Sequence, residues 1–394
     1  MPTHPGETHA FHNLYEGLSS VDCDGAVRPA LARHWSASPD GLRWSVVLRR
    51  HARDWNGTPI TAMNVERAWD RNAHATALGL PAWFADWEVR ARSADTLDIH
   101  LLEPDPSLPK RLAHPTLRVT LPAPATGPGS ARRSRWQIGT GPARPGELAT
   151  THLVLEPNSH HPHGLRAPVE IRWKPEVDAR NLLPNGYDVS VLRRLRAAEF
   201  LAQSHDGSLH PLPWDRRYIL LSPARTPLSM STSDRSELAV HVIEADGRVI
   251  EPEPDAANAL AGEPRRRSSG RQFRSNALVY QEGDEDARRM AERLVALDLP
   301  GVTHVEARER RVDLIRSVAT RSVRGSILAQ KLEAPWLPSD GRWHPSREGL
   351  RRLNLHVEDL VETRPVLVTH PAATGVAWDA WGQLDFSRAG WSHP

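Results

Sequence analysis

The chain has 394 residues, which is enough to bury a sizeable core and to divide into two or three domains. Its formal charge of +2 at pH 7 gives no whole-chain field that would favour nucleic acid or a membrane surface. Cys23 is the only cysteine, so an intrachain disulfide and a cysteine metal cage are excluded. No apolar run is long enough to span a membrane, and the N-terminal residues lack the pattern of a secretory leader. As written, the chain is expected in the cytoplasm, or in the periplasm if a leader precedes it.

The first part of the chain predicts strands and helices in alternation. Residues 29–32, Pro-Ala-Leu-Ala, favour a helix. Residues 42–48 and 96–101 alternate apolar and polar side chains, which is typical of half-buried strands. Thr61 is placed to cap a helix with an apolar stripe. Both α and β structure is therefore expected from the start of the chain.

The middle of the chain predicts three strands separated by loops. The strands are expected at 152–156, 168–173 and 216–222. Residues 122–135 and 251–274 have no apolar period and are predicted to be exposed loops.

The last third predicts a βαβ unit. An apolar strand at 277–280 leads to an amphipathic helix, which ends before a strand that starts at Val302. A final helix is predicted over 350–361, because apolar residues recur there at helical spacing. It feeds a strand at 366–368. The fold class is therefore α/β throughout.

A glycine-rich stretch imitates a dinucleotide-binding motif. Residues 139–142 are Gly-Thr-Gly-Pro, and Gly146 follows. Pro142 and Pro145 remove amides that a phosphate would need, and no helix is predicted to begin there. The glycines therefore predict a tight backbone turn and no cofactor.

Two further stretches could bind ions. Residues 159–163, Ser-His-His-Pro-His, could hold a divalent metal weakly, which would suit a metal-dependent hydrolase. No nearby carboxylate or cysteine completes a ligand set, so a surface loop is the expectation and no metal site is predicted. The arginine-rich residues 264–274 could touch phosphates, but such a run is typical of a surface loop. No pair of residues has the spacing of a catalytic site, so the protein is not expected to be an enzyme.

Residues 14–69 resemble the start of the family 5 solute-binding proteins, the extracytoplasmic receptors of peptide and nickel ABC transporters. The resemblance rests on Tyr-Glu-Gly-Leu at 15–18, Asp-Gly-Leu at 40–42 before a strand, and Asn-Gly-Thr-Pro at 56–59. "IGTGPA" at 138–143 is similar to the family's Gly-Thr-Gly-Pro-Tyr, with Ala143 in place of tyrosine.

This resemblance implies a two-lobed, periplasmic-binding-protein-like α/β fold of type II, family 5. The family's first strand normally precedes Tyr-Glu-Gly-Leu and has no counterpart here, so the fold is expected to be N-terminally truncated. We expect residues 1–215 and 346–394 to form one lobe and residues 216–345 a smaller one. The chain would then cross between the lobes at least twice.

A narrower likeness links residues 96–109, 216–225 and 375–391 to the sensor half of SgrR-type transcription regulators. It implies a non-catalytic sensor of a small molecule, which would reach DNA only through a winged-helix domain absent from this chain. The alternative is the receptor of a peptide or oligopeptide ABC transporter, with a permease as partner. No position matches the aspartate and arginine with which peptide receptors hold peptide termini. Direct membrane insertion is not expected.

Five residues are predicted to contact the solute, because a lobed receptor binds near the crossings between its lobes. Trp214 and Arg216 precede the first expected crossing, and His370, Trp381 and Asp385 come from the chain end.

A tryptophan face could stack on a sugar ring, and an arginine could hold a phosphate or carboxylate. A sugar, a sugar phosphate or a short peptide is therefore the expected ligand. The alternative is that Trp381 and Phe386 seal the core of the first lobe and that Arg216 pairs with Asp215 or with a surface carboxylate.

Overall fold

The structure is a computed structural model, and it describes most of the chain. The described residues are 5–74, 82–122, 136–149, 151–172, 187–230, 234, 238, 246–250, 273–331, 350 and 352–391. Within these residues no helix is long and apolar enough to cross a membrane.

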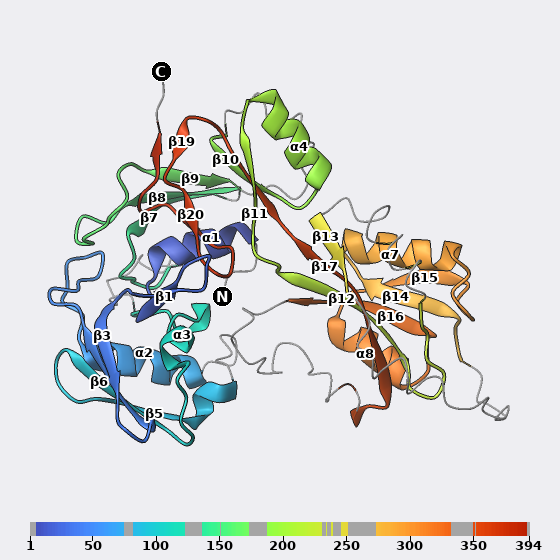
Figure 1. Cartoon of the computed structure of the whole chain (residues 1–394), viewed down its shortest axis with the longest axis horizontal. Coiled ribbons are helices and arrows are strands. Elements are labelled where there is room, and N and C mark those ends of the chain that lie inside the picture. Colours follow the sequence, from blue (N-terminus) through green and yellow to red (C-terminus); the bar gives the residue numbers. More distant parts are fainter. Residues whose placement is uncertain are drawn as a thin grey trace, which may run out of the picture. The chain divides into compact units, whose positions relative to one another are not determined.

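The chain divides into two compact units (Figure 1). The first unit holds the described residues up to Val189 and from His370 onward, and the second holds those from Ser190 to Thr369. Within the described residues the chain changes unit after Val189 and after Thr369. The first lobe was expected to end at residue 215 and to resume at residue 346. The first change of unit therefore comes earlier in the chain than expected, and the last comes later.

The first unit combines short helices with small sheets. Its helices are α1 (Pro5–Leu14), α2 (Ala62–His74), α3 (Leu108–Arg111) and the 3-10 helices η1 (Ala82–Asp86) and η2 (Pro115–Leu117). Its main sheet, in the order β3-β4-β6-β5, is made of β3 (Ala32–Ala37), β4 (Arg43–Leu48), β6 (Thr96–Leu101) and β5 (Trp87–Ala91). A second sheet is made of β7 (Ala143–Leu148), β8 (His152–Pro157) and β9 (Val169–Arg172).

Three strand pairs complete the first unit. They are β1 (Ser19–Val21) with β2 (Val27–Pro29), β19 (Ala373–Thr374) with β22 (Gly390–Trp391), and β20 (Ala377–Trp378) with β21 (Leu384–Asp385). The core forms where α2 covers the main sheet. Val46 of β4 and Trp69 of α2 are both buried there, and the Trp69 indole N–H donates to the Leu117 carbonyl at 2.8 Å.

The described residues of the second unit include two sheets and three helices. The helices are α4 (Leu195–Ser204), α7 (Glu285–Ala296) and α8 (Arg311–Ala319). The small sheet, in the order β10-β18-β11, is made of β10 (Val189–Leu192), β18 (Val366–Thr369) and β11 (Ser208–Pro211). The large sheet, in the order β13-β17-β12-β16-β14-β15, is made of β13 (Asp246–Val249), β17 (Leu355–Arg364), β12 (Arg216–Pro223), β16 (Gly325–Lys331), β14 (Ala277–Gln281) and β15 (His304–Arg308).

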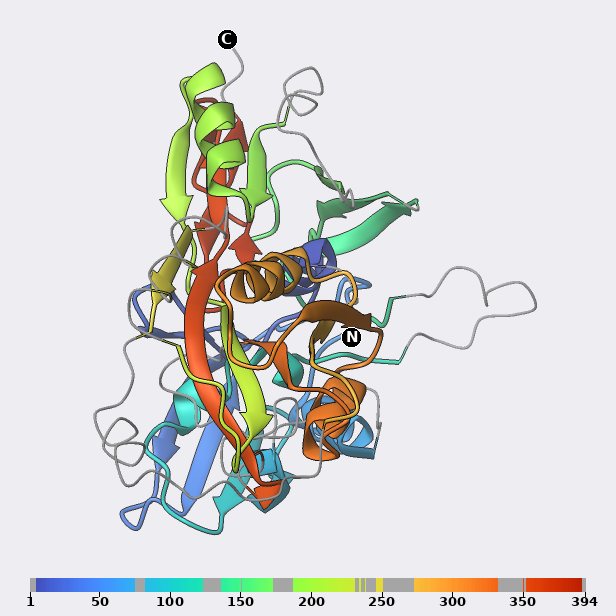
Figure 2. The ribbon, with the colours of Figure 1, turned by 90° about the vertical axis from the view of Figure 1, so that its right-hand side faces the viewer.

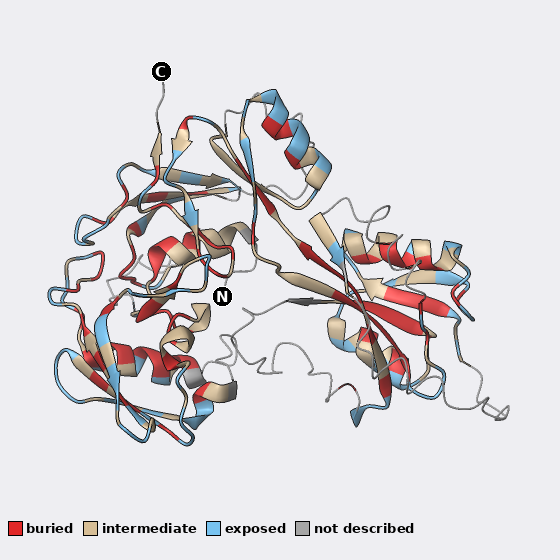
Figure 3. Ribbon diagram, in the orientation of Figure 1, coloured by how far each residue is buried: buried red, intermediate tan, exposed pale blue. Residues whose placement is uncertain are grey.

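Helices cover both faces of the large sheet. Successive side chains of a strand point to opposite faces. Tyr218 and Leu220 of β12 pack into the cluster that contains the apolar side of α7, whereas Ile219 and Leu221 pack into the cluster that contains α8. Figure 2 shows α7 and α8 beside the long strands β12 and β17, and Figure 3 shows how completely the middle of this sheet is buried.

Most predicted strands and helices are confirmed. The strands at 42–48, 96–101 and 216–222 correspond to β4, β6 and β12, and the helix at Thr61 corresponds to α2. The strands at 152–156 and 168–173 are β8 and β9, and 366–368 is β18. The βαβ unit is β14–α7–β15, with its second strand starting at His304. Residues 123–135 and 251–272 of the two predicted loops lie outside the described residues.

The helix predicted over 350–361 is wrong, because residues Leu355–Arg364 form β17. Its pairing with β12 shifts between Tyr218 and Ile219, which leaves Leu360 as an extra residue. Such a bulge changes which face the following side chains occupy. The apolar residues therefore do not alternate, and their spacing imitates a helix.

The helix favoured at 29–32 is also wrong. These residues join β2 to β3, and the amides of Ala30 and Ala32 both donate to the Leu18 carbonyl, at 3.2 and 2.9 Å. Hydrogen bonds to Leu18, which comes earlier in the chain, hold this extended conformation. Local helix propensity cannot predict such a contact.

Candidate functional site

Trp214 and Arg216, two of the predicted site residues, lie where strand ends gather in the second unit. β14 is parallel to β15 and β16, and β12 runs against β16 and β17. The carboxyl ends of β14, β15, β16 and β17 therefore meet at one edge of the large sheet, together with the start of β12. In open α/β sheets ligands bind outside the carboxyl ends of the strands. We call this edge, with its loops, the carboxyl edge.

A half-buried acidic pair, Asp284 and Asp286, marks the carboxyl edge. The Tyr218 hydroxyl lies 3.2 Å from Asp284 Oδ1 and 3.4 Å from Asp286 Oδ2. Asp284 Oδ1 also accepts from the Ala287 amide at 3.0 Å, which caps α7 and fixes the carboxylate. Burial, and then the neighbouring Asp284 charge, raises the pKa of Asp286. This pair is therefore suited to a positively charged group.

Arg216 supplies the opposite charge beside this pair. Burial disfavours its guanidinium charge, but Tyr218, Asp215 and Asp284 outweigh burial and raise its pKa. The ion pair that Asp215 makes is with Arg193, and not with Arg216 as the packing alternative expected. Arg193 Nη1 and Asp215 Oδ1 are shielded from solvent and make no hydrogen bond within the described part of the chain. Polar atoms in this position are available to a bound molecule.

Trp214 is held by two arginines from neighbouring strands. The guanidinium carbons of Arg248 and Arg364 lie over its ring, 4.5 and 4.3 Å from the centroid. Arg364 Nε donates to Asp246 Oδ2 at 2.6 Å, and Arg248 Nε donates to Glu362 Oε2 at 2.8 Å. Cation–π contacts of this kind fix the ring in place.

Glu362 joins the three strands next to Trp214. It is 3% exposed and lies opposite Arg217 of β12 and Arg248 of β13 in the sheet register. Arg217 donates to Glu362 Oε1 at 2.6 Å from Nη2, and Arg248 donates to Oε2. Two charge-assisted contacts compensate the buried carboxylate and fix the strands beside Trp214.

The other three predicted site residues lie in the first unit. His370 forms a turn, in which its amide donates to the Asp188 carbonyl at 2.8 Å and its Nδ1 accepts from the Ala372 amide at 3.1 Å. Asp385 Oδ1 accepts from the Ser387 amide at 2.8 Å.

Trp381 is half-buried and packs against the small cluster of Val21, Ala113 and Ala380. Its ring meets His114 edge-on, with 6.1 Å between centroids. Phe386 is buried. Trp214 and Arg216 therefore lie in one unit with different contact partners, and His370, Trp381 and Asp385 lie in the other.

A buried polar cluster near Trp381 is absent from the sequence prediction. Arg118, 4% exposed, donates from Nη2 to Gln383 Oε1 at 2.6 Å and lies 3.5 Å from Asp379 Oδ2. His12 of α1 contacts both Arg118 Nη2, at 2.5 Å, and Asp379 Oδ2, at 3.3 Å. Burial lowers the pKa of Arg118 to about 10. The cluster ties α1 to the β20–β21 pair.

The histidine stretch at 159–163 has structural contacts. His161 Nε2 lies 3.1 Å from Glu16 Oε1, and Arg49 binds the same carboxylate at 2.8 Å through each of two nitrogens. The His160 ring covers Gly57, where an added Cβ would lie 3.0 Å from it. Among the described residues no group of three or more His, Cys, Asp or Glu side chains is placed to hold a metal ion.

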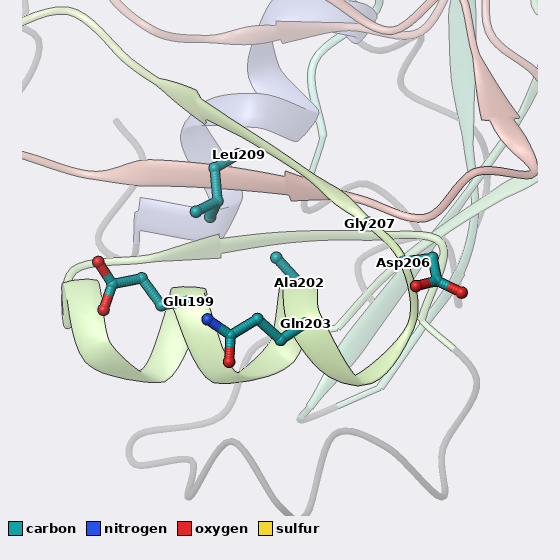
Figure 4. Close-up of a pocket in the computed structure, with 6 residues that line it drawn as sticks. All are labelled: Glu199, Ala202, Gln203, Asp206, Gly207 and Leu209. Atoms are coloured by element: carbon teal, nitrogen blue, oxygen red, sulfur yellow. The ribbon is translucent and has the colours of Figure 1, made fainter.

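A surface pocket lies between α4 and β11 in the second unit (Figure 4). Its volume is about 550 Å³, and it is lined by Glu199, Ala202, Gln203, Asp206, Gly207 and Leu209. The sequence analysis does not predict this pocket, because its lining comes from α4 and β11, two elements absent from the predicted strands and helices.

Part of the chain matches a family model and several curated proteins. Residues 26–205 match the model described as bacterial extracellular solute-binding proteins, family 5 Middle. The periplasmic oligopeptide-binding protein OppA of Escherichia coli (strain K12) is 29% identical over 137 residues, covering 30% of this chain and 24% of that protein. The nickel-binding periplasmic protein of the same strain is 30% identical over 143 residues, covering 35% of this chain and 27% of that protein. The matched stretches thus span about a quarter of these relatives.

Solved structures are similar over nearly the whole chain. NikA from Brucella suis, in complex with Fe(III)-EDTA, has a TM-score of 0.75 at 16% identity and covers 98% of this chain and 95% of that chain. The Escherichia coli murein tripeptide binding protein MppA has a TM-score of 0.70 at 16% identity, with 99% and 95% covered. The protein therefore has the two-unit α/β fold of the family 5 bacterial extracellular solute-binding proteins, and residues 26–205 match that family's model.

Proposed function

We propose that this protein is a non-catalytic solute-binding protein that delivers a short peptide, or a metal bound to a small chelator, to an ABC transporter in the extracytoplasmic space. The observation that carries the proposal is the fold match. The similarity to NikA from Brucella suis covers 98% of this chain and 95% of that chain, so it includes both units. OppA, MppA and the nickel-binding protein are named for peptides or nickel.

The carboxyl edge supports a solute that carries both signs of charge. Asp284 and Asp286 suit a cationic group, and Arg216 suits an anionic one. A short peptide has both, and so does a metal chelate of amino acids. A neutral sugar would form an ion pair with neither the carboxylates nor the guanidinium group. Sugars and sugar phosphates, which the sequence also suggested, therefore come after peptides and chelates.

The second candidate function, suggested by the narrower sequence likeness, is the sensor of a transcription regulator. It also requires that this protein binds a small molecule. It differs only in what is encoded beside this domain. An upstream winged helix in the same reading frame would favour the sensor, whereas a secretory leader would favour the receptor. The receptor comes first because the relatives reported above are transport receptors by name.

A thermal-shift screen tests the proposal, because a ligand that binds the folded state raises the melting temperature. The panel contains dipeptides, tripeptides, a nickel–histidine complex, glucose and glucose phosphate. We expect a shift with a peptide or the nickel complex, and a saturable calorimetric titration with the same compound. A shift with the sugar compounds alone would overturn the assignment of solute class, and no shift with any compound would overturn the receptor itself.

Asp286→Asn and Arg216→Gln report on the carboxyl edge in the same titration. Each variant should bind the compound that gives the thermal shift about 30-fold more weakly. This loss corresponds to about 2 kcal/mol for a half-buried charge partner. Arg28→Gln serves as the matched control, because Arg28 is 67% exposed, pairs with Asp22 and belongs to the first unit, outside this edge. Equal losses in all three variants would contradict a solute contact at this edge.

A further inference from the structure

We propose that Asp286 holds a proton in the free protein and gives it up when a cationic group enters the carboxyl edge, so that solute binding there is coupled to pH. The cationic solute rests on the proposed function, whereas the proton is a property of the free protein. Three oxygen atoms carry the inference, namely the Tyr218 hydroxyl and one carboxylate oxygen each of Asp284 and Asp286.

A single phenolic proton serves two carboxylates. The Tyr218 hydroxyl oxygen lies 3.2 Å from Asp284 Oδ1 and 3.4 Å from Asp286 Oδ2, and a tyrosine has only one O–H to donate. If both carboxylates were ionised, one of these contacts would bring two acceptors together. A proton on one carboxyl removes the conflict, because that carboxyl then donates to Tyr218 while Tyr218 donates to the other.

Helix α7 decides which carboxyl keeps the proton. Asp284 is the N-cap of this helix, and its Oδ1 accepts from the Ala287 amide at 3.0 Å. An amide N–H at a helix N-terminus stabilises a negative charge, so this contact favours ionised Asp284. Among the described residues, the only hydrogen-bond partner of the Asp286 carboxyl is Tyr218. The chain of hydrogen bonds therefore runs from Asp286 to Tyr218 and from Tyr218 to Asp284.

Burial acts in the same direction as this geometry. Tyr218 is completely buried, and burial and the two aspartate charges raise its pKa, so its hydroxyl stays protonated. Burial, followed by the charge of Asp284, also raises the pKa of Asp286. A proton on Asp286 spares the cluster a second negative charge beside Asp284.

Two arginines oppose the proton on Asp286. Arg193, which precedes α4, and Arg216 of β12 both favour the ionised form of its carboxyl. Arg193 is paired with Asp215, which offsets part of its charge. Glu285, the other acid in the first turn of α7, pairs with arginines of its own helix. Burial and Asp284 outweigh the two arginines, so the pKa of Asp286 stays raised.

A cationic solute exchanges with this proton. The O–H bond of Asp286 breaks, the proton goes to the solvent, and the ammonium group of the solute pairs with the two ionised carboxylates. One positive charge thus replaces another at the carboxyl edge. Because a lower pH favours the proton, the affinity for a cationic solute should fall on acidification, by at most about tenfold for each pH unit.

Urea unfolding measures the proton without any solute. The comparison is between the wild type and Asp286→Asn, whose amide can donate to Tyr218 as the protonated acid does. A carboxyl with a raised pKa binds its proton more tightly in the folded state than in the unfolded chain. The wild type should therefore lose stability relative to the variant as the pH rises from about 4 to about 7.5. Other titrating groups are common to both proteins and cancel in the difference.

The same comparison in an Asp284→Asn background is the matched control, since asparagine also caps a helix. The relative loss should persist but move to lower pH, because burial is the first cause of the raised pKa and the Asp284 charge is the second. Circular dichroism establishes that each variant is folded. Parallel curves for the wild type and Asp286→Asn, or a wild type that gains stability relative to the variant as the pH rises, would overturn the proposal. An unchanged pH range in the Asp284→Asn background would remove Asp284 from the chain of hydrogen bonds.

Calorimetric titration in two buffers of different ionisation enthalpy counts the protons released on binding. Trialanine is the cationic probe, and N-acetyltrialanine is the matched compound without an ammonium group. The nickel–histidine complex is measured in the same way. At the midpoint pH of the unfolding difference, where Asp286 is half protonated, trialanine should release about half a proton and N-acetyltrialanine none. Binding of trialanine without proton release would overturn the exchange. No binding by any compound of the thermal-shift panel would overturn the proposed function, while the unfolding curves still decide whether Asp286 holds the proton.

Discussion

Glu16 is the residue at which distant segments of the first unit converge. It is 10% exposed at its side chain and receives two 2.8 Å hydrogen bonds from Arg49 and one contact of 3.1 Å from His161. Burial raises the pKa of this carboxyl, but His161 and Arg49 outweigh burial and lower it overall. The histidine stretch that could suggest a metal is thus part of an ion-pair network.

Glu16→Ala should destabilise the protein by about 3 kcal/mol, because it leaves Arg49 partly buried without its carboxylate. Urea unfolding measures the change. Glu88→Ala removes the exposed partner of Arg90, where the side chains are 68% and 63% exposed, and should cost less than about 0.5 kcal/mol. Similar losses in the two variants would contradict a special role for Glu16.

His9 makes the stability of the first unit depend on pH. Its Nδ1 accepts from the Leu384 amide at 3.1 Å, so this nitrogen carries no proton in the folded state. Burial, followed by the charge of His12, lowers the pKa of His9 from 6.5 to about 4. The unfolded chain therefore binds a proton between these values and the folded chain does not, so stability should fall as the pH decreases from 6.5 to about 4.

The free energy of unfolding, measured with urea between pH 7.5 and pH 4, tests this dependence. The loss assigned to His9 should reach about 3 kcal/mol at the acidic end. His9→Asn keeps an acceptor for the Leu384 amide and removes the titrating group, so its stability should fall less over the same range. Parallel curves for the wild type and the variant would assign the pH dependence to other groups.

The candidate site was predictable from sequence only in part. Trp214 and Arg216 stand beside a recognisable strand, and Asp284 precedes a recognisable helix in a capping position. The polar cluster of Arg118 gave no signal, because its partners Asp379 and Gln383 are 261 and 265 residues away in the sequence. Contacts at such separation depend on the fold and not on local pattern.

At the scale of elements, periodicity predicted the strands and helices whose faces are uniform. β4 and β6 alternate buried and less buried side chains along their length, and α7 has a single apolar stripe. The prediction failed for β17, because the bulge at Leu360 changes which face its side chains occupy. No helix was predicted for α8, because only Leu314 and Val318 of this helix are buried and they form no clear apolar stripe. Departures from a regular repeat therefore explain why β17 and α8 were not predicted.

The Gly-Thr-Gly turn is an element whose role the structure specifies. An added Cβ would lie 2.1 Å from the Leu14 carbonyl at Gly139 and 2.3 Å from the Asn13 carbonyl at Gly141. The Gly141 amide donates to Leu14 O at 3.0 Å, so the end of α1 rests directly on this turn. The glycines serve close backbone approach, in agreement with the turn expected there.

Gly141→Ala should therefore destabilise the first unit by about 3 kcal/mol, since the backbone of α1 has to move away. Gly146→Ala is the control, because the atoms nearest its Cβ belong to the flexible side chain of Glu156. It should change stability by less than about 1 kcal/mol. Thermal unfolding followed by circular dichroism separates the two, and a mild effect at Gly141 would contradict the close packing of α1 on the turn.

At the scale of the whole molecule, the five predicted site residues divide between the two units. Trp214 and Arg216 belong to the second unit, and His370, Trp381 and Asp385 to the first. The two groups therefore predict solute contacts in different units. One variant in each unit tests whether its residues contact the solute. Trp381 has packing neighbours in Val21, Ala113 and Ala380, whereas Arg216 lies among the charges of the carboxyl edge.

Trp381→Ala should lower the melting temperature by several degrees, because it removes about 2 kcal/mol of packing, and should leave the affinity of the folded protein for its solute unchanged. Arg216→Gln should weaken that affinity with little change in melting temperature, and Arg216→Lys should restore part of it by restoring the charge. Calorimetric titration with the compound found in the screen, together with melting of each free variant, separates affinity from stability. A loss of affinity in folded Trp381→Ala would place solute contacts in the first unit, and intact binding in Arg216→Gln would remove Arg216 from the site.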